Sequence, residues 1–317
     1  GKKTGTNRKG RLHLQPGCVV ETAQHQPGCL VENLGYLGGV VLLLFNLLMI
    51  MKPDLFGIAK DSSLPARISF VTVFVWWIGF SQITFSRLPK YTFRKRMKRE
   101  SVLSNGYKEL RRVFVQINKS YKFSLYLTGF FFLMMGVLTT MFMAATYGEK
   151  EIGLKEDVLI PTILVIQLVG MAGAWMFARI SEKLGNLQAL MITIVAWTLI
   201  CIGAYFISNA TEFIIAAFFI GIVMGGSQSL ARSTYSKMLP ADTTDHTSFF
   251  SFYDVMEKLA TVAGTFSFGF MEALTGSMRY SVLAITIFFI LSLFFMLLLY
   301  RKIRIETRTQ IPVETEA

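Results

Sequence analysis

Eight apolar segments, most of them about 20 residues long, constrain this chain more than any other feature. A helix needs about 20 apolar residues to cross a bilayer, and within hydrocarbon the backbone polar groups must be satisfied by the spanning structure itself. We therefore expect an all-α membrane protein with eight spans, of which the first is short and extends backwards. The segments cover residues 36–51, 68–85, 123–147, 158–177, 187–207, 213–230, 249–274 and 280–300.

Composition supports this reading and argues against a soluble domain. Apolar residues make up 53% of the 317 residues, against 16% charged residues, which is more apolar material than a soluble core requires. The net charge of +12 does not indicate nucleic-acid binding, because the cations gather beside apolar segments. Cys18, Cys29 and Cys201 lack the spacing of a disulfide framework or a metal site, so no metal and no cofactor are predicted.

The segment 87–122 is strongly basic, with twelve Lys or Arg and only two acidic residues. Such a density of cations next to apolar spans is typical of a cytoplasmic loop. Within it, apolar residues recur at helical spacing and predict an amphipathic helix on the inner leaflet, in contact with membrane lipid. A solvated linker helix is the alternative. The apolar face consists of Tyr107, Leu110, Phe114, Ile117 and Tyr121.

The distribution of cations predicts the orientation of the whole chain. With eight spans, 26 Lys and Arg fall on one side of the membrane and six on the other, which places both termini in the cytoplasm. The basic loop leaves two spans before it and six after it. Many secondary transporters join two six-helix halves through such a linker, so we expect four earlier spans in a longer chain. The expected regions are a polar segment (1–34), two spans of a truncated first half (35–86), the linker (87–122), a six-helix second half (123–304) and a disordered tail (305–317).

Several short motifs resemble a known family. The chain is similar to the major facilitator superfamily and, within it, to the vacuole effluxer-like family of autophagy-related amino-acid effluxers and their bacterial relatives. The resemblance covers about residues 34–304. The motifs that carry it are Gly35-Tyr36-Leu37-Gly38-Gly39, Leu64-Pro65-Ala66-Arg67, Trp76-Trp77-Ile78-Gly79-Phe80, Gly225-Gly226-Ser227-Gln228-Ser229-Leu230-Ala231-Arg232-Ser233 and Phe249-Phe250-Ser251-Phe252-Tyr253-Asp254.

This resemblance implies a major facilitator-like helical bundle that transports a small polar solute, an amino acid, by alternating access. It implies a monomer in the bacterial cell membrane in preference to the vacuolar membrane, with protons as a candidate coupling ion. The loop 178–186 resembles the superfamily's Gly-x-Leu-x-Asp-Arg-x-Gly-Arg pattern and keeps Glu182, Lys183 and Gly185. We expect Gly185 to form the turn, and Glu182 and Lys183 either to latch an inner gate or to be solvated charges.

Polar side chains within apolar spans are candidate solute contacts, because they are costly in hydrocarbon unless they face a cavity or another helix. Gln167 is the first candidate, and Gln228 follows because Gly221, Gly225 and Gly226 lie beside it. Helix-to-helix hydrogen bonding or simple close packing explains the same residues. Asn46 and Gln82 are further candidates, with the same alternative.

Three charged residues open the seventh span. Asp254 and Lys258 are four residues apart and are expected to pair on one helix face, which leaves Glu257 as the candidate proton-coupling carboxylate. The alternative is a cluster at the inner interface, with Lys258 reaching towards lipid phosphates.

Other functions are weaker fits to these residues. A permease for peptides or cell-wall fragments remains open, as does a membrane scaffold without transport activity. An enzyme is not predicted, because the sequence offers no histidine-containing or paired-carboxylate constellation at a membrane face.

Overall fold

The computed structural model describes residues 27–58, 64–87, 102–239 and 246–309, and the regular structure of these residues is entirely helical. This confirms the all-α class. The short 3-10 helix η1 (Pro53–Phe56) follows the first helix. The remaining elements are α1 (Pro27–Met51), α2 (Leu64–Arg87), α3 (Val102–Asn118), α4 (Tyr121–Lys150), α5 (Glu156–Leu184), α6 (Asn186–Ala204), α7 (Ala210–Met238), α8 (His246–Thr275) and α9 (Met278–Thr309).

Each of the eight apolar segments falls in a helix of its own, α1, α2 and α4–α9. Within the described ranges, six helices are long and apolar enough to cross a membrane, namely α2, α4, α5, α6, α7 and α9. Helix α1 begins at Pro27, nine residues before the apolar segment that starts at residue 36. Helix α8 is 30 residues long and carries four charged side chains, Asp254, Glu257, Lys258 and Glu272.

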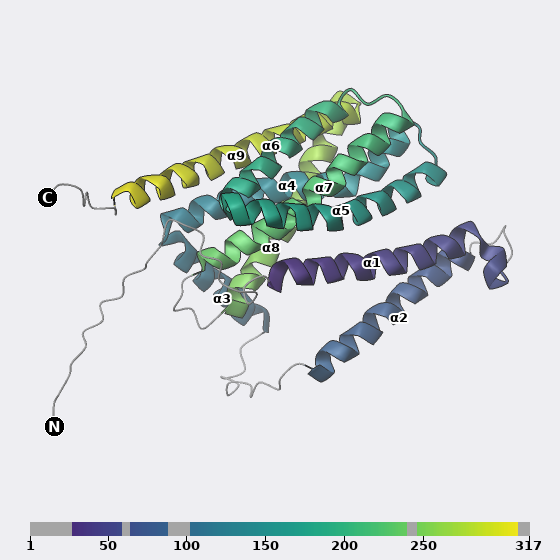
Figure 1. The fold of residues 1–317 in the computed structure, drawn as a ribbon, viewed down its shortest axis with the longest axis horizontal. Helices are drawn as coiled ribbons and strands as arrows, with labels where there is room; N and C mark the ends of the chain where they lie inside the picture. The colour runs from purple at the N-terminus through teal and green to yellow at the C-terminus, as the bar shows by residue number, and fades with distance from the viewer. Residues whose placement is uncertain (1–26, 59–63, 88–101, 240–245, 310–317) are drawn as a thin grey trace.

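Helices α4–α9 form one bundle, and α1 and α2 lie beside it as an antiparallel pair (Figure 1). Helix α1 packs against α5 and α7, whereas α2 packs mainly against α1. Most of α2 is therefore exposed, with large apolar side chains such as Phe70 and Trp77 at 78% and 70% exposure.

The bundle core is built from large side chains whose polar atoms find partners on a neighbouring helix. Tyr126 of α4 donates its hydroxyl to the Ala231 carbonyl of α7 at 2.6 Å, and Tyr235 of α7 donates to the Phe249 carbonyl of α8 at 2.6 Å. The Trp197 ring of α6 is fully buried and stacks on Phe289 of α9. A buried hydroxyl or indole N–H must be paired to avoid a desolvation cost, so these contacts fix how the helices meet.

Glycines set the contact between α5 and α7. A Cβ built on Gly225 would lie 2.0 Å from the Gly170 carbonyl oxygen, and one on Gly173 would lie 2.1 Å from the Ile222 oxygen. Gly221 meets the Ile166 oxygen at 2.8 Å in the same way. Only glycine permits this approach of two backbones, as in the small-residue contacts of membrane helices. The glycines beside Gln228 therefore serve close packing.

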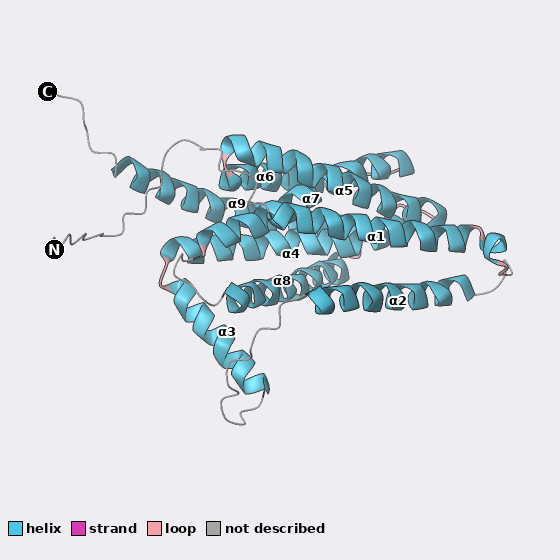
Figure 2. Ribbon diagram, turned by 60° about the horizontal axis from the view of Figure 1, so that its bottom comes forward, coloured by secondary structure: helices cyan, strands magenta, loops and turns pink. Residues whose placement is uncertain are grey.

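The amphipathic linker helix is present as α3, which projects at an angle from the end of the bundle (Figure 2). Val113 and Ile117 are buried against the bundle, where α3 packs on α8 and α4. Tyr107 and Phe114 of the predicted apolar face are exposed. Including Tyr121 in that face was wrong, because α3 ends at Asn118 and Tyr121 begins α4.

Candidate functional site

Two of the four candidate solute contacts lie within the bundle. Gln167 is half-buried on α5, and its side chain forms no hydrogen bond with another described residue. Gln228 is half-buried on α7, one turn beyond Met224, and its amide nitrogen lies 3.5 Å from the Met141 sulfur of α4. Each amide lies in a largely apolar stretch of its helix. Whether they contact a solute stays a prediction.

The other two candidates belong to the α1–α2 pair. The Asn46 side chain is buried, and its amide oxygen accepts a 2.7 Å hydrogen bond from the Thr72 hydroxyl of α2. This is the helix-to-helix bond that the sequence left open as the alternative. Gln82 is exposed near the end of α2.

The turn between α5 and α6 is the sharpest in the bundle. Gly185 alone joins the two helices and has φ +89°, a conformation that favours glycine. Glu182 and Lys183 are exposed, and neither side chain forms an ion pair with another described residue. The turn is held instead by Asn186, one of two residues, with Ala178, at which the sequence departs from the superfamily pattern. Its amide oxygen accepts from Ser181 (2.7 Å) and Lys237 (3.0 Å), and its amide nitrogen donates to Ser233 (2.8 Å).

The charged residues at the start of α8 pair differently from the expectation. Asp254 lies 3.5 Å from the Arg232 guanidinium of α7, and Lys258 lies 3.8 Å from Glu257. The predicted pairing of Asp254 with Lys258 is therefore wrong. Asp254 pairs with the neighbouring helix instead. The Arg232 guanidinium lies over the Tyr253 ring, 5.3 Å from its centroid, and this contact holds the guanidinium close to Asp254. Glu257 is half-buried, and its partner Lys258 is largely exposed.

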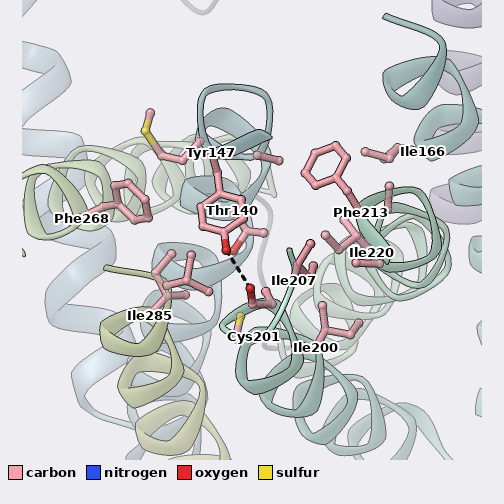
Figure 3. Close-up of a pocket in the computed structure, with 16 residues that line it drawn as sticks. Thr140, Tyr147, Ile166, Ile200, Cys201, Ile207, Phe213, Ile220, Phe268 and Ile285 are labelled. Carbon is pink, nitrogen blue, oxygen red and sulfur yellow. Dashed lines mark hydrogen bonds between the residues drawn. The ribbon is translucent and has the colours of Figure 1, made fainter. Parts of the chain in front are cut away.

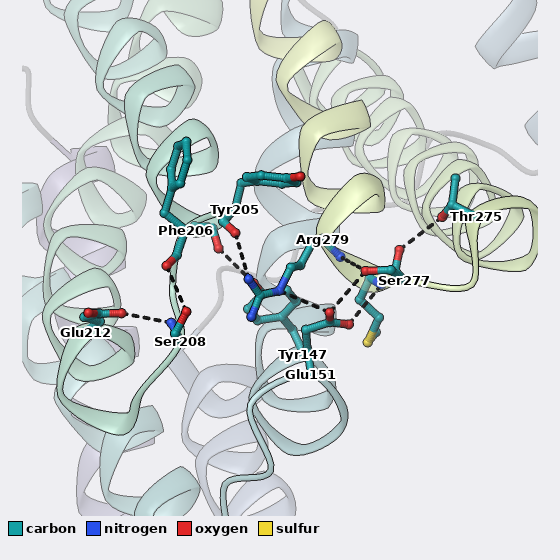
Figure 4. A network of polar contacts seen from close by, with 11 residues as sticks. Tyr147, Glu151, Tyr205, Phe206, Ser208, Glu212, Thr275, Ser277 and Arg279 are labelled. Carbon is teal, nitrogen blue, oxygen red and sulfur yellow. Dashed lines mark hydrogen bonds and ion pairs between the residues drawn. The ribbon is translucent and has the colours of Figure 1, made fainter.

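The opposite end of the bundle is closed by a second polar network (Figure 4). Glu151, just after α4, accepts from the Arg279 side chain at 3.2 Å, from the Ser277 hydroxyl at 3.1 Å and from the Met278 backbone N–H at 3.2 Å. Arg279 also donates to the Tyr205 carbonyl at 3.4 Å, after α6. One carboxylate and one guanidinium thus connect the ends of α4, α6 and α9.

An apolar cavity of about 50 Å³ is lined by α4–α9 near this network (Figure 3). Tyr147 borders it and donates its hydroxyl to the Ala204 carbonyl at 2.8 Å. The other lining side chains are almost all apolar, so the cavity offers no recognition of a polar solute. In the described part of the chain, no three His, Cys, Asp or Glu side chains come together in a way that could hold a metal ion.

The sequence matches a known family over nearly the whole described region. Residues 32–306 fit the family described as "Vacuole effluxer Atg22 like". The chain belongs to this Atg22-like family. The resemblance seen in the sequence motifs is thereby confirmed.

Named relatives of this Atg22-like chain come from bacteria and fungi. A Bacillus subtilis protein described as the uncharacterized MFS-type transporter YxiO is 25% identical over 260 residues, which cover 82% of this chain and 60% of the relative. Autophagy-related protein 22 of Cryptococcus neoformans is 24% identical over 272 residues, with 79% and 46% coverage. Its Eremothecium gossypii counterpart is 21% identical over 277 residues, with 82% and 53% coverage. The chain spans about half the length of these relatives.

Sequence reasoning about this Atg22-like chain missed the residues that form the tightest polar networks. Asn186 is not one of the residues that the motif keeps, although an amide at a one-residue turn has donors and acceptors for both adjoining helices. Arg279 was counted only as one of the cations on one side of the membrane, and Glu151 was not singled out. They are 128 residues apart, and no local spacing signals that they meet.

Proposed function

We propose that this protein is a secondary transporter that moves a small polar solute, an amino acid, across a membrane by alternating access. The proposal depends mainly on the family match over residues 32–306, because that family is described as one of vacuole effluxers. The arrangement of a helix pair beside a six-helix bundle supports it, since transporters of this kind work by rocking one group of helices against another.

Gln167 is the residue we propose to contact the solute first. It lies mid-way along α5, and its amide has no hydrogen-bond partner among the described residues. An amide in hydrocarbon is costly unless it faces a polar partner, a wet cavity or a ligand. Gln228 of α7 is the second proposed contact. Asn46 is a weaker one, because its amide oxygen already bonds to Thr72.

In the proposed transporter, the two polar networks act as gates at the two ends of the bundle. At the end that we place in the cytoplasm, Asn186 connects the α5–α6 turn to α7, and Arg232 connects α7 to α8. At the other end, Glu151 and Arg279 connect α4 to α9. Opening either end would break one network while the other persists. Glu257, whose Lys258 partner is solvent-exposed, is the proposed proton-coupling group.

Transport by proteoliposomes tests the proposal. The full-length protein is reconstituted, and uptake of a panel of labelled amino acids is measured with and without a proton gradient. We expect flux above that of empty vesicles, and a loss of about tenfold for Gln167→Ala, the equivalent of one hydrogen bond to a charged ligand. Gln116→Ala, at an exposed position of α3, is the matched control. If the flux of every amino acid equals the flux into empty vesicles, the proposal is wrong.

The proposed location is the bacterial cell membrane, with both termini in the cytoplasm and the protein as a monomer. The excess of cations on one side of the eight spans supports this orientation. The starts of α4 and α8, which are on that side, lie at the end of the bundle where α3 lies (Figure 2).

A further inference from the structure

A groove lies where the linker helix meets the bundle. It encloses about 270 Å³ between α3, α4 and α8, which is several times the volume of the apolar cavity at the other end. Helix α3 contributes Phe114, Ile117 and Asn118, and α8 contributes Phe252 and Met256. Helix α4 forms the wall between them with Ser124, Leu127, Thr128, Phe131 and Phe132.

The lining of this groove changes in polarity along its length. Asn118 and Ser124 lie at the corner between α3 and α4, and their side chains form no hydrogen bonds with other described residues. From Ser124 to Phe132 the groove follows α4 for about 12 Å, at 1.5 Å per residue, and its far part is lined by Phe131 and Phe132. A ligand that fits this lining has a polar end at the corner and an apolar end of about that depth.

A cation lies beyond the polar corner of the groove, on the same flank of α3. Arg111 is one turn before Phe114 and two turns before Asn118, so all three lie on one flank of α3. Arg111 is exposed, and it forms no ion pair within the described part of the chain. Arg112, by contrast, lies on another face of the helix and pairs with Glu109 at 3.8 Å. The exposed Tyr107 and Phe114 extend the apolar surface on either side of Arg111.

We propose that this groove binds one anionic phospholipid, with an acyl chain between α3, α4 and α8, the polar end of that chain at the Asn118 corner and the phosphate beyond it at Arg111. The groove encloses about 270 Å³, whereas drug-sized ligands need about 300 Å³ or more, so it takes no more than one chain. The groove lies where an amphipathic helix meets the ends of two spans, and phospholipid headgroups lie at this depth of a membrane. A guanidinium with free donors recognises phosphate in two-point geometry, which selects a phospholipid over an uncharged amphiphile.

Native mass spectrometry of the full-length protein in detergent tests the site. Phosphatidylglycerol and diacylglycerol, which lacks the phosphate, are titrated separately with identical acyl chains, and the first tightly retained lipid is counted. We expect one phosphatidylglycerol to bind about tenfold more tightly than diacylglycerol, the value of one charge-assisted contact. Arg111→Gln removes this preference. Arg112→Gln, with the same change in charge on the same helix, retains it.

A second variant tests the groove independently of charge. Ser124→Trp fills the polar corner and is expected to abolish retention of both lipids, whereas Ser120→Trp, four residues earlier and outside the groove, is expected to leave it unchanged. Size-exclusion profiles identify any variant that fails to fold. If a tryptophan variant fails to fold, the comparison of Arg111→Gln with Arg112→Gln tests the proposal alone. Equal losses in Arg111→Gln and Arg112→Gln would overturn the proposal, because they indicate diffuse attraction. No retained lipid in the wild-type protein would overturn it as well.

Discussion

Replacing Gly225 by alanine is the sharpest test of how the bundle is packed. The new Cβ would lie 2.0 Å from the Gly170 carbonyl oxygen, whereas ordinary contacts begin at 3.4 Å, so α5 and α7 must separate by about 1.4 Å. A gap of that size forfeits much of the dispersion energy along the contact, and overpacking of a helix interface costs about 1–3 kcal/mol. The gain in helix propensity from glycine to alanine offsets only about 0.5–1 kcal/mol of this.

Thermal unfolding of the purified protein in detergent measures the effect. For a protein of this size class, about 2 kcal/mol corresponds to an apparent Tm lower by about 4–8 °C. Gly173→Ala, whose Cβ would lie 2.1 Å from the Ile222 oxygen, is expected to behave in the same way. Gly269→Ala is the control, because nothing lies within 4 Å of its Cβ position on α8. An unchanged or raised Tm for Gly225→Ala would refute the close approach of α5 and α7.

Two further predictions concern polar groups of the bundle, and a third concerns the orientation of the linker. Arg279→Gln removes the cation that joins Glu151 to the Tyr205 carbonyl, and we expect a loss of about 1 kcal/mol because the pair is partly exposed; an unchanged Tm in the same unfolding assay would contradict it. Glu257→Gln is expected to remove the effect of a proton gradient on flux in proteoliposomes, while retained gradient dependence would exclude Glu257 as the coupling group. A cysteine placed at Ser101 in the linker is expected to react with an impermeant maleimide only in inside-out vesicles, and labelling of intact cells would reverse the orientation.

The helices could be predicted from the sequence because a bilayer gives an apolar segment of about 20 residues few other ways to satisfy its backbone. The turn at Gly185 was predictable for a similar local reason, since its φ of +89° favours glycine. The linker helix was predicted correctly in its periodicity, but its end was not. Nothing in the spacing of Tyr121 indicates that Lys119 and Ser120 break the helix before it.

The candidate site was less predictable, because its contacts join residues far apart in the chain. The four-residue spacing of Asp254 and Lys258 favoured a local pair, but Arg232 of the neighbouring helix competes for the same carboxylate. The hydrogen bond between Asn46 and Thr72 spans 26 residues and depends on how α1 and α2 pack. Tertiary packing determines the partner of each of these side chains, and the local spacing of residues does not indicate how the helices pack.

The small cavity beside Tyr147 has a consequence of its own. Because its walls are almost wholly apolar, it has nothing to anchor a water molecule, and a dry hollow of this kind takes up inert gases. Pressure favours states with less void volume, so it is expected to act on this end of the bundle before it disturbs the glycine-lined contact between α5 and α7, where the two backbones already touch.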